Sequence, residues 1–239
     1  MRSSTVVLDE RPALPGTEIA RTFAVNRALS KLVASAANAG ELPVVLAGNC
    51  NSCLGTVSGA RASIESVVWL DGHADFDTPQ TSTHGFFGGM ALAALTGACW
   101  EALCASIPGY RRIEADRVLL VGTRHLSAVE VSALDAAGIV RAEASEIGAV
   151  VELGARGGAY LHIDLDVLDP AVARANPWAA SDGISPDELV EAVRWICERR
   201  PPRAAALTAY DPAGDPAGEV ASAAVRVLAA IGEGARKGL

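Results

Sequence analysis

Several common sequence signals are missing from this 239-residue chain. No apolar run is long enough to cross a bilayer, and residues 1–11 lack the apolar core of a secretory leader. No linker, repeat or low-complexity segment divides the sequence, which predicts a single domain over residues 1–239. The net charge is -8, with acidic and basic residues mixed. Neither nucleic acid nor an anionic membrane is therefore expected as the main partner.

Cysteine is also scarce, and the five cysteines are an odd number. Without a leader, they are expected to be free thiols in a reducing cytoplasm. The hydrophobic fraction is 50%, which is enough for a sizeable buried core.

Short apolar runs alternate with longer segments of helical periodicity. The predicted strands are residues 5–8, 43–47, 66–70, 117–122, 138–141, 159–165 and 204–209. The predicted helices are residues 18–37, 89–95, 128–137, 186–199 and 219–232. The strands are continuously hydrophobic, as in sheets that are buried on both faces. This alternation predicts a three-layer α/β/α sandwich with a mainly parallel sheet.

Polar residues follow the apolar runs, at the strand ends where open parallel sheets bind ligands. One run is followed by Asp71, His73 and Asp75, and another leads into Asp164 and Asp166. Alternate residues share one side of an extended chain, so each set is expected to converge. Four carboxylates packed together would raise one another's pKa values unless cations lie among them.

Oxygen ligands with one imidazole suit Mn²⁺, with Fe²⁺, Co²⁺ and Zn²⁺ as competitors. Two bridged ions can hold a shared hydroxide, which is a nucleophile at neutral pH. The alternative is that these acids cap helices and line surface loops. Two such sets, with a histidine between acids, favour a metal-dependent hydrolase.

These motifs resemble those of the ureohydrolase family, which includes arginase and agmatinase. Residues 71–75 (DGHAD) resemble its D-A-H-x-D motif, and residues 161–170 (LHIDLDVLDP) resemble its S-x-D-x-D-x-x-D-P motif. Residues 48–52 (GNCNS) resemble its G-G-D-H-S segment. The resemblance runs from about residue 44 to residue 212 and implies an arginase-like fold with two Mn²⁺ ions at strand ends.

The resemblance also implies which residues hold the two ions. One ion is expected on Cys50, Asp71, Asp75 and Asp164, and the other on His73, Asp71, Asp164 and Asp166. Asp71 and Asp164 would bridge the ions. Asp75 is the expected catalytic residue, which passes a proton from the attacking hydroxide to the leaving amine.

Three positions and one loop depart from the family pattern. The loop is the one that grips the amino-acid carboxylate in arginase, and here it contains Asp77, Ser82, His84 and Phe86. Cys50 stands where the family has a metal-binding histidine, and Gly88 stands where arginase has its proton-shuttle histidine. Ala209 stands where the last family motif has a glutamate that pairs with the guanidinium. A thiolate is a softer, negatively charged ligand, and we expect Cys50 to bind metal. The alternative is that Cys50 is a small buried residue and the metal has one ligand fewer.

The missing shuttle indicates a less basic substrate, because a hydroxyl group on a guanidine lowers its basicity and reduces the need for proton transfer. Cys50 and Gly88 together resemble the branch of the family that hydrolyses Nω-hydroxy-L-arginine to hydroxyurea and L-ornithine in D-cycloserine biosynthesis. A metal-bridging hydroxide would attack the guanidino carbon. The alternatives are another ureohydrolase (arginase, agmatinase, or a guanidino- or formimino-acid hydrolase), an inactive binding protein, and a single-zinc hydrolase.

Contacts to a guanidino or hydroxyguanidino amino acid are expected from nearby loops, at Asp77, Ser82, His84, Glu130 and Asp211. The alternative for Glu130 is a solvated helix face, and for Asp211 a strand-end turn. His162 is expected to hydrogen-bond to a metal ligand rather than bind metal. The chain ends soon after the helix predicted at residues 219–232, so a monomer is expected.

Overall fold

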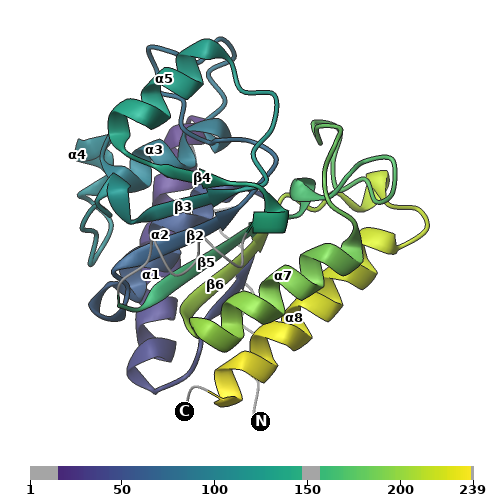
Figure 1. Ribbon diagram of the computed structural model, residues 1–239. Helices are drawn as coiled ribbons and strands as arrows, with labels where there is room; N and C mark the ends of the chain where they lie inside the picture. The colour runs from purple at the N-terminus through teal and green to yellow at the C-terminus, as the bar shows by residue number, and fades with distance from the viewer. Residues whose placement is uncertain (1–15, 147–156, 238–239) are drawn as a thin grey trace.

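The computed structural model describes residues 16–146 and 157–237. In these residues a 6-stranded parallel sheet has the order β1-β6-β5-β2-β3-β4 (Figure 1). The strands are β1 (Val44–Leu46), β2 (Ser66–Leu70), β3 (Val118–Val121), β4 (Val140–Ala142), β5 (Ala159–Asp164) and β6 (Pro202–Thr208). The strand predicted at residues 5–8 lies outside the described residues.

Helices cover both faces of the sheet, which confirms the predicted α/β/α sandwich. The longer helices are α1 (Glu18–Asn38), α2 (Cys53–Gly59), α3 (Ala91–Thr96), α5 (Ala128–Ala137), α7 (Pro186–Arg199) and α8 (Glu219–Lys237), and α4 (Glu101–Cys104) is a single turn. Helices α7 and α8 lie on one face, and α1, α2 and α3 lie on the other (Figure 1). Within the described residues, no helix has the length and apolarity needed to span a membrane.

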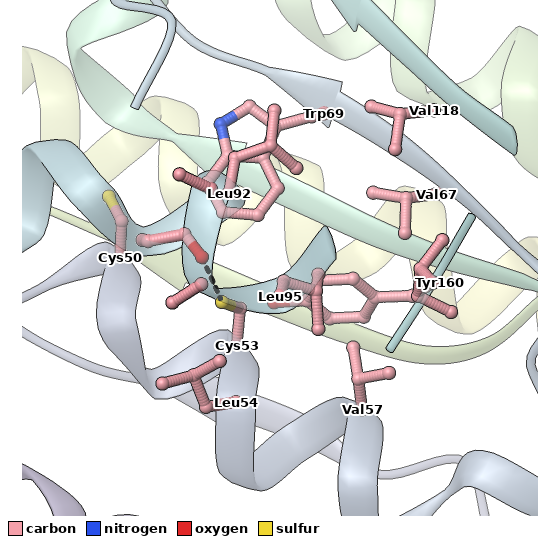
Figure 2. Close-up of a cluster of buried hydrophobic side chains, with 14 of the residues drawn as sticks. Cys50, Cys53, Leu54, Val57, Val67, Trp69, Leu92, Leu95, Val118 and Tyr160 are labelled. Carbon is pink, nitrogen blue, oxygen red and sulfur yellow. Dashed lines mark hydrogen bonds between the residues drawn. The ribbon is translucent and has the colours of Figure 1, made fainter. Parts of the chain in front are cut away.

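Alternate residues of each strand enter two separate cores. Trp69 and Tyr160 pack with α2 and α3 residues in one core (Figure 2), whereas Leu70 and Leu161 pack against α7 and α8 in the other. All five cysteines are buried and unpaired, as expected for free thiols. Because side chains alternate along a strand, Asp71 and Asp164 face the same side of the sheet as Trp69 and Tyr160.

Local chemistry explains where the predicted boundaries hold and where they shift. Helices α5 and α7 have the predicted bounds, and each begins with a capping box, from Ser127 and Ser185. Strand β4 starts later than predicted because Gly138, at φ 74°, ends α5 in a left-handed conformation. Ala209 is also left-handed, at φ 62°, so β6 ends at Thr208. Helices α2 and α4 were not predicted, because both are too short to show a period.

The order in which strands are added to the sheet changes side between β2 and its neighbour β5. Strands β3 and β4 extend the sheet on one side of β2, whereas β5 and β6 extend it on the other. In open parallel sheets, the crevice at the carboxyl ends of such a strand pair is where ligands bind. The polar residues that follow β2 and β5 therefore meet at the expected ligand-binding position.

Helix α2 is held against α1 by two close backbone approaches. Gly55 N–H donates to buried Asn26 Oδ1 at 2.6 Å. A methyl group added at Gly59 would lie 2.5 Å from Ser30 O and 2.7 Å from Val33 Cβ. This packing matters for the site, because α2 follows the turn that carries Cys50.

Substituting Gly59→Ala is expected to lower the free energy of unfolding by roughly 1–3 kcal/mol, because the added methyl forces α2 away from the α1 backbone. Urea denaturation would measure the change. Gly89→Ala is the matched control, since a methyl group there meets no atom within 4 Å. Equal stability of the two variants would contradict this account of the α1–α2 contact.

Candidate metal centre

Asp71 and Asp164 lie side by side at the switch between β2 and β5. Leu70 pairs with Ile163, so the next residues, Asp71 and Asp164, continue the same register. Both side chains are buried, at 1% and 3% exposure. The sheet topology alone thus brings together two acids that are far apart in sequence.

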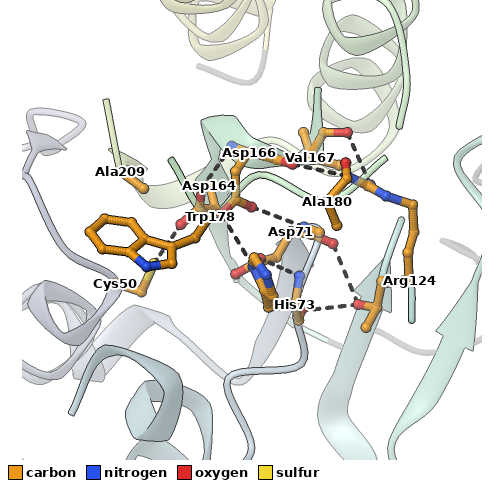
Figure 3. A network of polar contacts seen from close by, with 12 residues as sticks. Cys50, Asp71, His73, Arg124, Asp164, Asp166, Val167, Trp178, Ala180 and Ala209 are labelled. Atoms are coloured by element: carbon orange, nitrogen blue, oxygen red, sulfur yellow. Dashed lines mark hydrogen bonds and ion pairs between the residues drawn. The ribbon is translucent and has the colours of Figure 1, made fainter. Parts of the chain in front are cut away.

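Cys50 reaches this pair from the turn before α2. Its thiol donates to Asp164 Oδ2 at 2.7 Å and lies 3.3 Å from Thr208 Oγ1. Its sulfur, a His162 ring nitrogen, and carboxylate oxygens of Asp71 and Asp164 all lie within 4.8 Å of one another. Cys50 therefore occupies the position facing the two acids, as Figure 3 shows.

A second group adjoins the first through Asp71. Ligand atoms of Asp71, His73 and Asp166 lie within 4.8 Å of one another. His73 Nδ1 lies 3.2 Å from Asp166 Oδ2 and 3.7 Å from Asp71 Oδ1. The two groups share Asp71, which is the arrangement that two neighbouring cations require.

Burial and mutual repulsion raise the pKa values of most acidic groups in this cluster. Burial, with Asp166 as the next cause, raises the pKa of Asp71 to about 6. Burial and the neighbouring carboxylates raise the pKa values of Asp75 and Asp164 well above the ordinary range. Burial and Asp164 do the same to the pKa of the Cys50 thiol. Cations would displace these protons, because metal ligands bind in their deprotonated forms.

Asp166 is the exception to the predicted upward shifts. Burial alone would raise its pKa, but the hydrogen bond and charge of His73 lower the pKa of Asp166 to about 2. In turn, the hydrogen bonds to Asp166 and Asp71 raise the pKa of His73 to about 11. The prediction of uniformly raised values was wrong here, because it left out the charge of the histidine.

Asp75 is buried beside these groups with an unpartnered oxygen. Its side chain is 8% exposed, and its Oδ2 has no hydrogen-bond partner among the described residues. Its backbone is left-handed, at φ 48°, a strained conformation for aspartate. A buried carboxylate oxygen without a partner fits a site that is completed by a cation.

Neighbouring side chains hold the acids in place. Trp69 Nε1 donates to Asp71 Oδ2 at 2.9 Å, and Asn176 Nδ2 donates to Asp166 Oδ2 at 3.4 Å. Arg124 donates to the carbonyls of Asp166 and Val167 and clamps that loop to the end of β3 (Figure 3). Sequence reasoning missed Thr208 and Asn176, because neither stands in a recognisable motif.

The position of the absent shuttle histidine is occupied by an aromatic ring. A methyl group added at Gly88 would lie within 2.6 Å of two ring atoms of Phe86. Phe86 stacks on Trp178, with centroids 6.5 Å apart, and both rings are more than half exposed. Asn176 Oδ1 accepts from Trp178 N, which ties this aromatic pair to the Asp166 side of the centre.

The residues predicted to contact substrate are engaged in local hydrogen bonds. Glu130 accepts from Ser127 N in the capping box of α5, and Asp211 accepts from Ala213 N in a turn. Glu130 therefore lies in the first turn of α5, and Asp211 lies in a turn after β6. Asp77 accepts from Thr81 Oγ1, Ser82 from Gly85 N, and exposed His84 contacts Thr83 Oγ1. Their substrate contacts stay predictions.

A parallel α/β sheet with buried carboxylates, a histidine and a thiol at its switch point defines a metallohydrolase-like protein. The Arginase family model matches residues 7–232, and the chain belongs to that family. Arginase of Bacillus caldovelox is 29% identical over 222 residues, which cover 86% of this chain and 73% of the relative. Nω-hydroxy-L-arginine amidinohydrolase of Streptomyces lavendulae is 32% identical over 156 residues, which cover 62% of this chain and 54% of the relative.

The structural comparison supports the same family. The native structure of Bacillus caldovelox arginase at pH 5.6 superposes with a TM-score of 0.82 and 28% identity. The match covers 96% of this chain and 80% of that structure. The predicted arginase-like fold is confirmed. The match with the Streptomyces lavendulae relative spans about half of that relative's length.

Replacing the carboxyl of Asp75 with an amide is expected to stabilise the metal-free protein and weaken its response to metal. In chelator-treated protein, Asp75→Asn should raise the free energy of unfolding at pH 7 by roughly 1 kcal/mol or more. Burial raises the pKa of Asp75 well above its ordinary range, so folding at pH 7 carries the cost of protonating this carboxyl, which an amide avoids. Thermal unfolding with and without added Mn²⁺ would measure both effects, since a bound ion raises Tm.

Asp77→Asn is the matched control, because Asp77 lies in the same loop and bonds to Thr81 instead of the cluster. It should alter neither metal-free stability nor the rise in Tm. If Asp75→Asn has the same stability as this control, the Asp75 carboxyl does not destabilise the metal-free protein.

Proposed function

We propose that this protein is a binuclear amidinohydrolase that converts Nω-hydroxy-L-arginine to hydroxyurea and L-ornithine. The observation that carries the proposal is the Cys50 thiol, 2.7 Å from Asp164 in the buried cluster. The ring of Phe86 over Gly88, in place of a shuttle histidine, supports a substrate that needs less proton transfer. The Streptomyces lavendulae relative bears the name of this activity.

The residues present fit two divalent cations, because burial and neighbouring carboxylates raise the pKa values of Asp75 and Asp164 and because Asp75 Oδ2 lacks a partner among the described residues. Cys50, Asp71, Asp75 and Asp164 would hold one ion, and His73, Asp71, Asp164 and Asp166 the other. Manganese is the metal that the family resemblance implies, and oxygen ligands suit it. When bound, the two ions supply an activated water for attack on the guanidino carbon.

The chain itself supplies positioning and proton transfer. Asp75 Oδ2, the carboxylate oxygen without a partner, accepts the proton of the attacking water and delivers it to the leaving nitrogen. Trp69 and Asn176 hold Asp71 and Asp166 so that the acids keep their orientation during turnover. Phe86 and Trp178 form an exposed stacked pair beside Gly88, which could contact the substrate.

A second candidate is another ureohydrolase of the family, with arginine, agmatine, or a guanidino or formimino acid as substrate. The Bacillus caldovelox arginase match, which covers more of the chain, favours it. Ala209 stands in place of the glutamate that pairs with the guanidinium, which argues against arginine and similar substrates. An inactive binding protein is therefore a third candidate. A cytoplasmic location and a monomeric state stay predictions from the sequence.

A substrate panel tests the proposal. Manganese-loaded protein should release hydroxyurea from Nω-hydroxy-L-arginine with a kcat/KM at least about tenfold above that for L-arginine or agmatine, a difference of about 1.4 kcal/mol in barrier. Chromatography of hydroxyurea, urea and the amine products would measure the rates. Faster turnover of arginine or agmatine would replace the proposal with the second candidate.

Asp75→Asn should lower kcat by roughly 10²- to 10⁴-fold, the usual contribution of a positioned general acid and base. The same preparation must keep two equivalents of metal for this comparison, which elemental analysis would establish. Full metal loading of unaltered protein without turnover of any guanidino compound would support the binding protein instead.

A further inference from the structure

The family's histidine at position 50 is lost, but an imidazole is present nearby. The S-x-D-x-D-x-x-D-P motif has a serine two residues before its first aspartate, and here that position is His162. Two departures that are 112 positions apart therefore form a pair: His is replaced by Cys at one, and Ser by His at the other. A lost ligand and a gained imidazole in one cluster suggest exchange rather than simple loss.

The fold brings these two residues together. His162 pairs with Trp69 in the sheet and stacks on its indole, with ring centroids 3.6 Å apart. Its Nε2 lies 3.3 Å from Thr208 Oγ1, which also lies 3.3 Å from Cys50 Sγ. His162 has the same strand facing as Asp164, two residues later, so its ring borders the acids.

The other ring nitrogen of His162 is in hydrogen-bond contact with Tyr160. His162 Nδ1 lies 2.9 Å from Tyr160 Oη, and both residues are fully buried. With a proton on Nδ1 that is donated to Tyr160, Nε2 presents its lone pair toward Cys50. Metal-binding histidines are commonly oriented by such a hydrogen bond through the second nitrogen.

We infer that His162 is a metal ligand and that, with Cys50, Asp71 and Asp164, it forms a position for a zinc- or cobalt-type divalent cation. One sulfur, one imidazole and two carboxylates make a four-ligand set of the kind that zinc prefers. The adjoining group of His73, Asp71 and Asp166 lacks sulfur and is the harder position. The unpartnered, buried Oδ2 of Asp75 is an independent sign that a cation completes this cluster.

This inference rests on the binuclear centre of the proposed function and sharpens its ligand set. It replaces the sequence expectations that His162 only hydrogen-bonds to a ligand and that Asp75 is the fourth ligand of the ion held by Cys50, Asp71 and Asp164. It also means that the two halves differ in their preference: the sulfur-containing half favours Zn²⁺ and Co²⁺, and the other half favours Mn²⁺.

Metal titration of the full chain tests it without an activity readout. One equivalent of Co²⁺ should give a sulfur-to-cobalt charge-transfer band and the intense visible bands of four-coordinate cobalt. Cys50→Ser should abolish the charge-transfer band. His162→Gln should alter the visible bands and lower Zn²⁺ affinity, measured against a chromophoric chelator, by more than about 100-fold, since a residue acting through a ligand costs about 10- to 100-fold.

His125→Gln is the matched control, because His125 is largely exposed and lies against Asp182 outside the cluster. It should leave the Co²⁺ spectrum and Zn²⁺ affinity unchanged. The exchange variant Cys50→His/His162→Ser should bind two ions without a charge-transfer band and should bind Mn²⁺ more tightly relative to Zn²⁺ than the unaltered chain does.

His162→Gln removes a ring from the core, so the unaltered protein provides a second test. X-ray absorption of the one-equivalent Zn²⁺ complex should show one sulfur and one imidazole in the coordination shell. The inference is overturned if the coordination shell contains sulfur but no imidazole. It is also overturned if His162→Gln lowers Zn²⁺ affinity by 100-fold or less. If the spectra behave as expected but no hydroxyurea forms, the ligand set stands and only the proposed substrate fails.

Discussion

The repulsion between Asp71 and Asp164 is the constraint on which the site depends. The sheet order places the ends of β2 and β5 next to each other, and the register continues Leu70–Ile163 directly into the two acids. Both are buried, so water cannot screen their charges. Without a compensating charge, such a buried pair destabilises the folded state. Cations that bind between the acids would stabilise the folded state instead.

Much of the surrounding structure serves to hold these charges at fixed positions. Trp69 and Asn176 donate to the acids from the sheet and from the loop after β5. Arg124 ties that loop to the end of β3 through the carbonyl oxygens of Asp166 and Val167. On the opposite side, the close α1–α2 packing sets where Cys50 stands.

The departures from the family pattern are connected in space. Cys50 and His162 lie in one cluster and exchange the residue type that supplies the imidazole. Gly88 leaves room that the Phe86 ring fills, and Phe86 in turn stacks on Trp178. Each altered position is matched by a neighbouring side chain that takes up its space or its chemistry. Ala209 differs, because the carboxylate two residues later, that of Asp211, is engaged in its own turn.

The sequence by itself determined the layered fold and the set of acids. Hydrophobic runs, capping residues and strand-end polarity are local features, so they predicted α5, α7, β2 and the motifs of Asp71 and Asp164. Local features also explain the hydrogen bonds of Glu130 and Asp211, whose partners lie two or three residues away.

Only the tertiary structure decided how those residues combine. The contact between Cys50 and Asp164 joins positions 114 residues apart, and Thr208 reaches His162 across 46 residues. The low pKa of Asp166 likewise depends on a histidine from another strand end. Such neighbours are set by strand order and register, which depend on the whole sheet and leave no periodic signal in the chain.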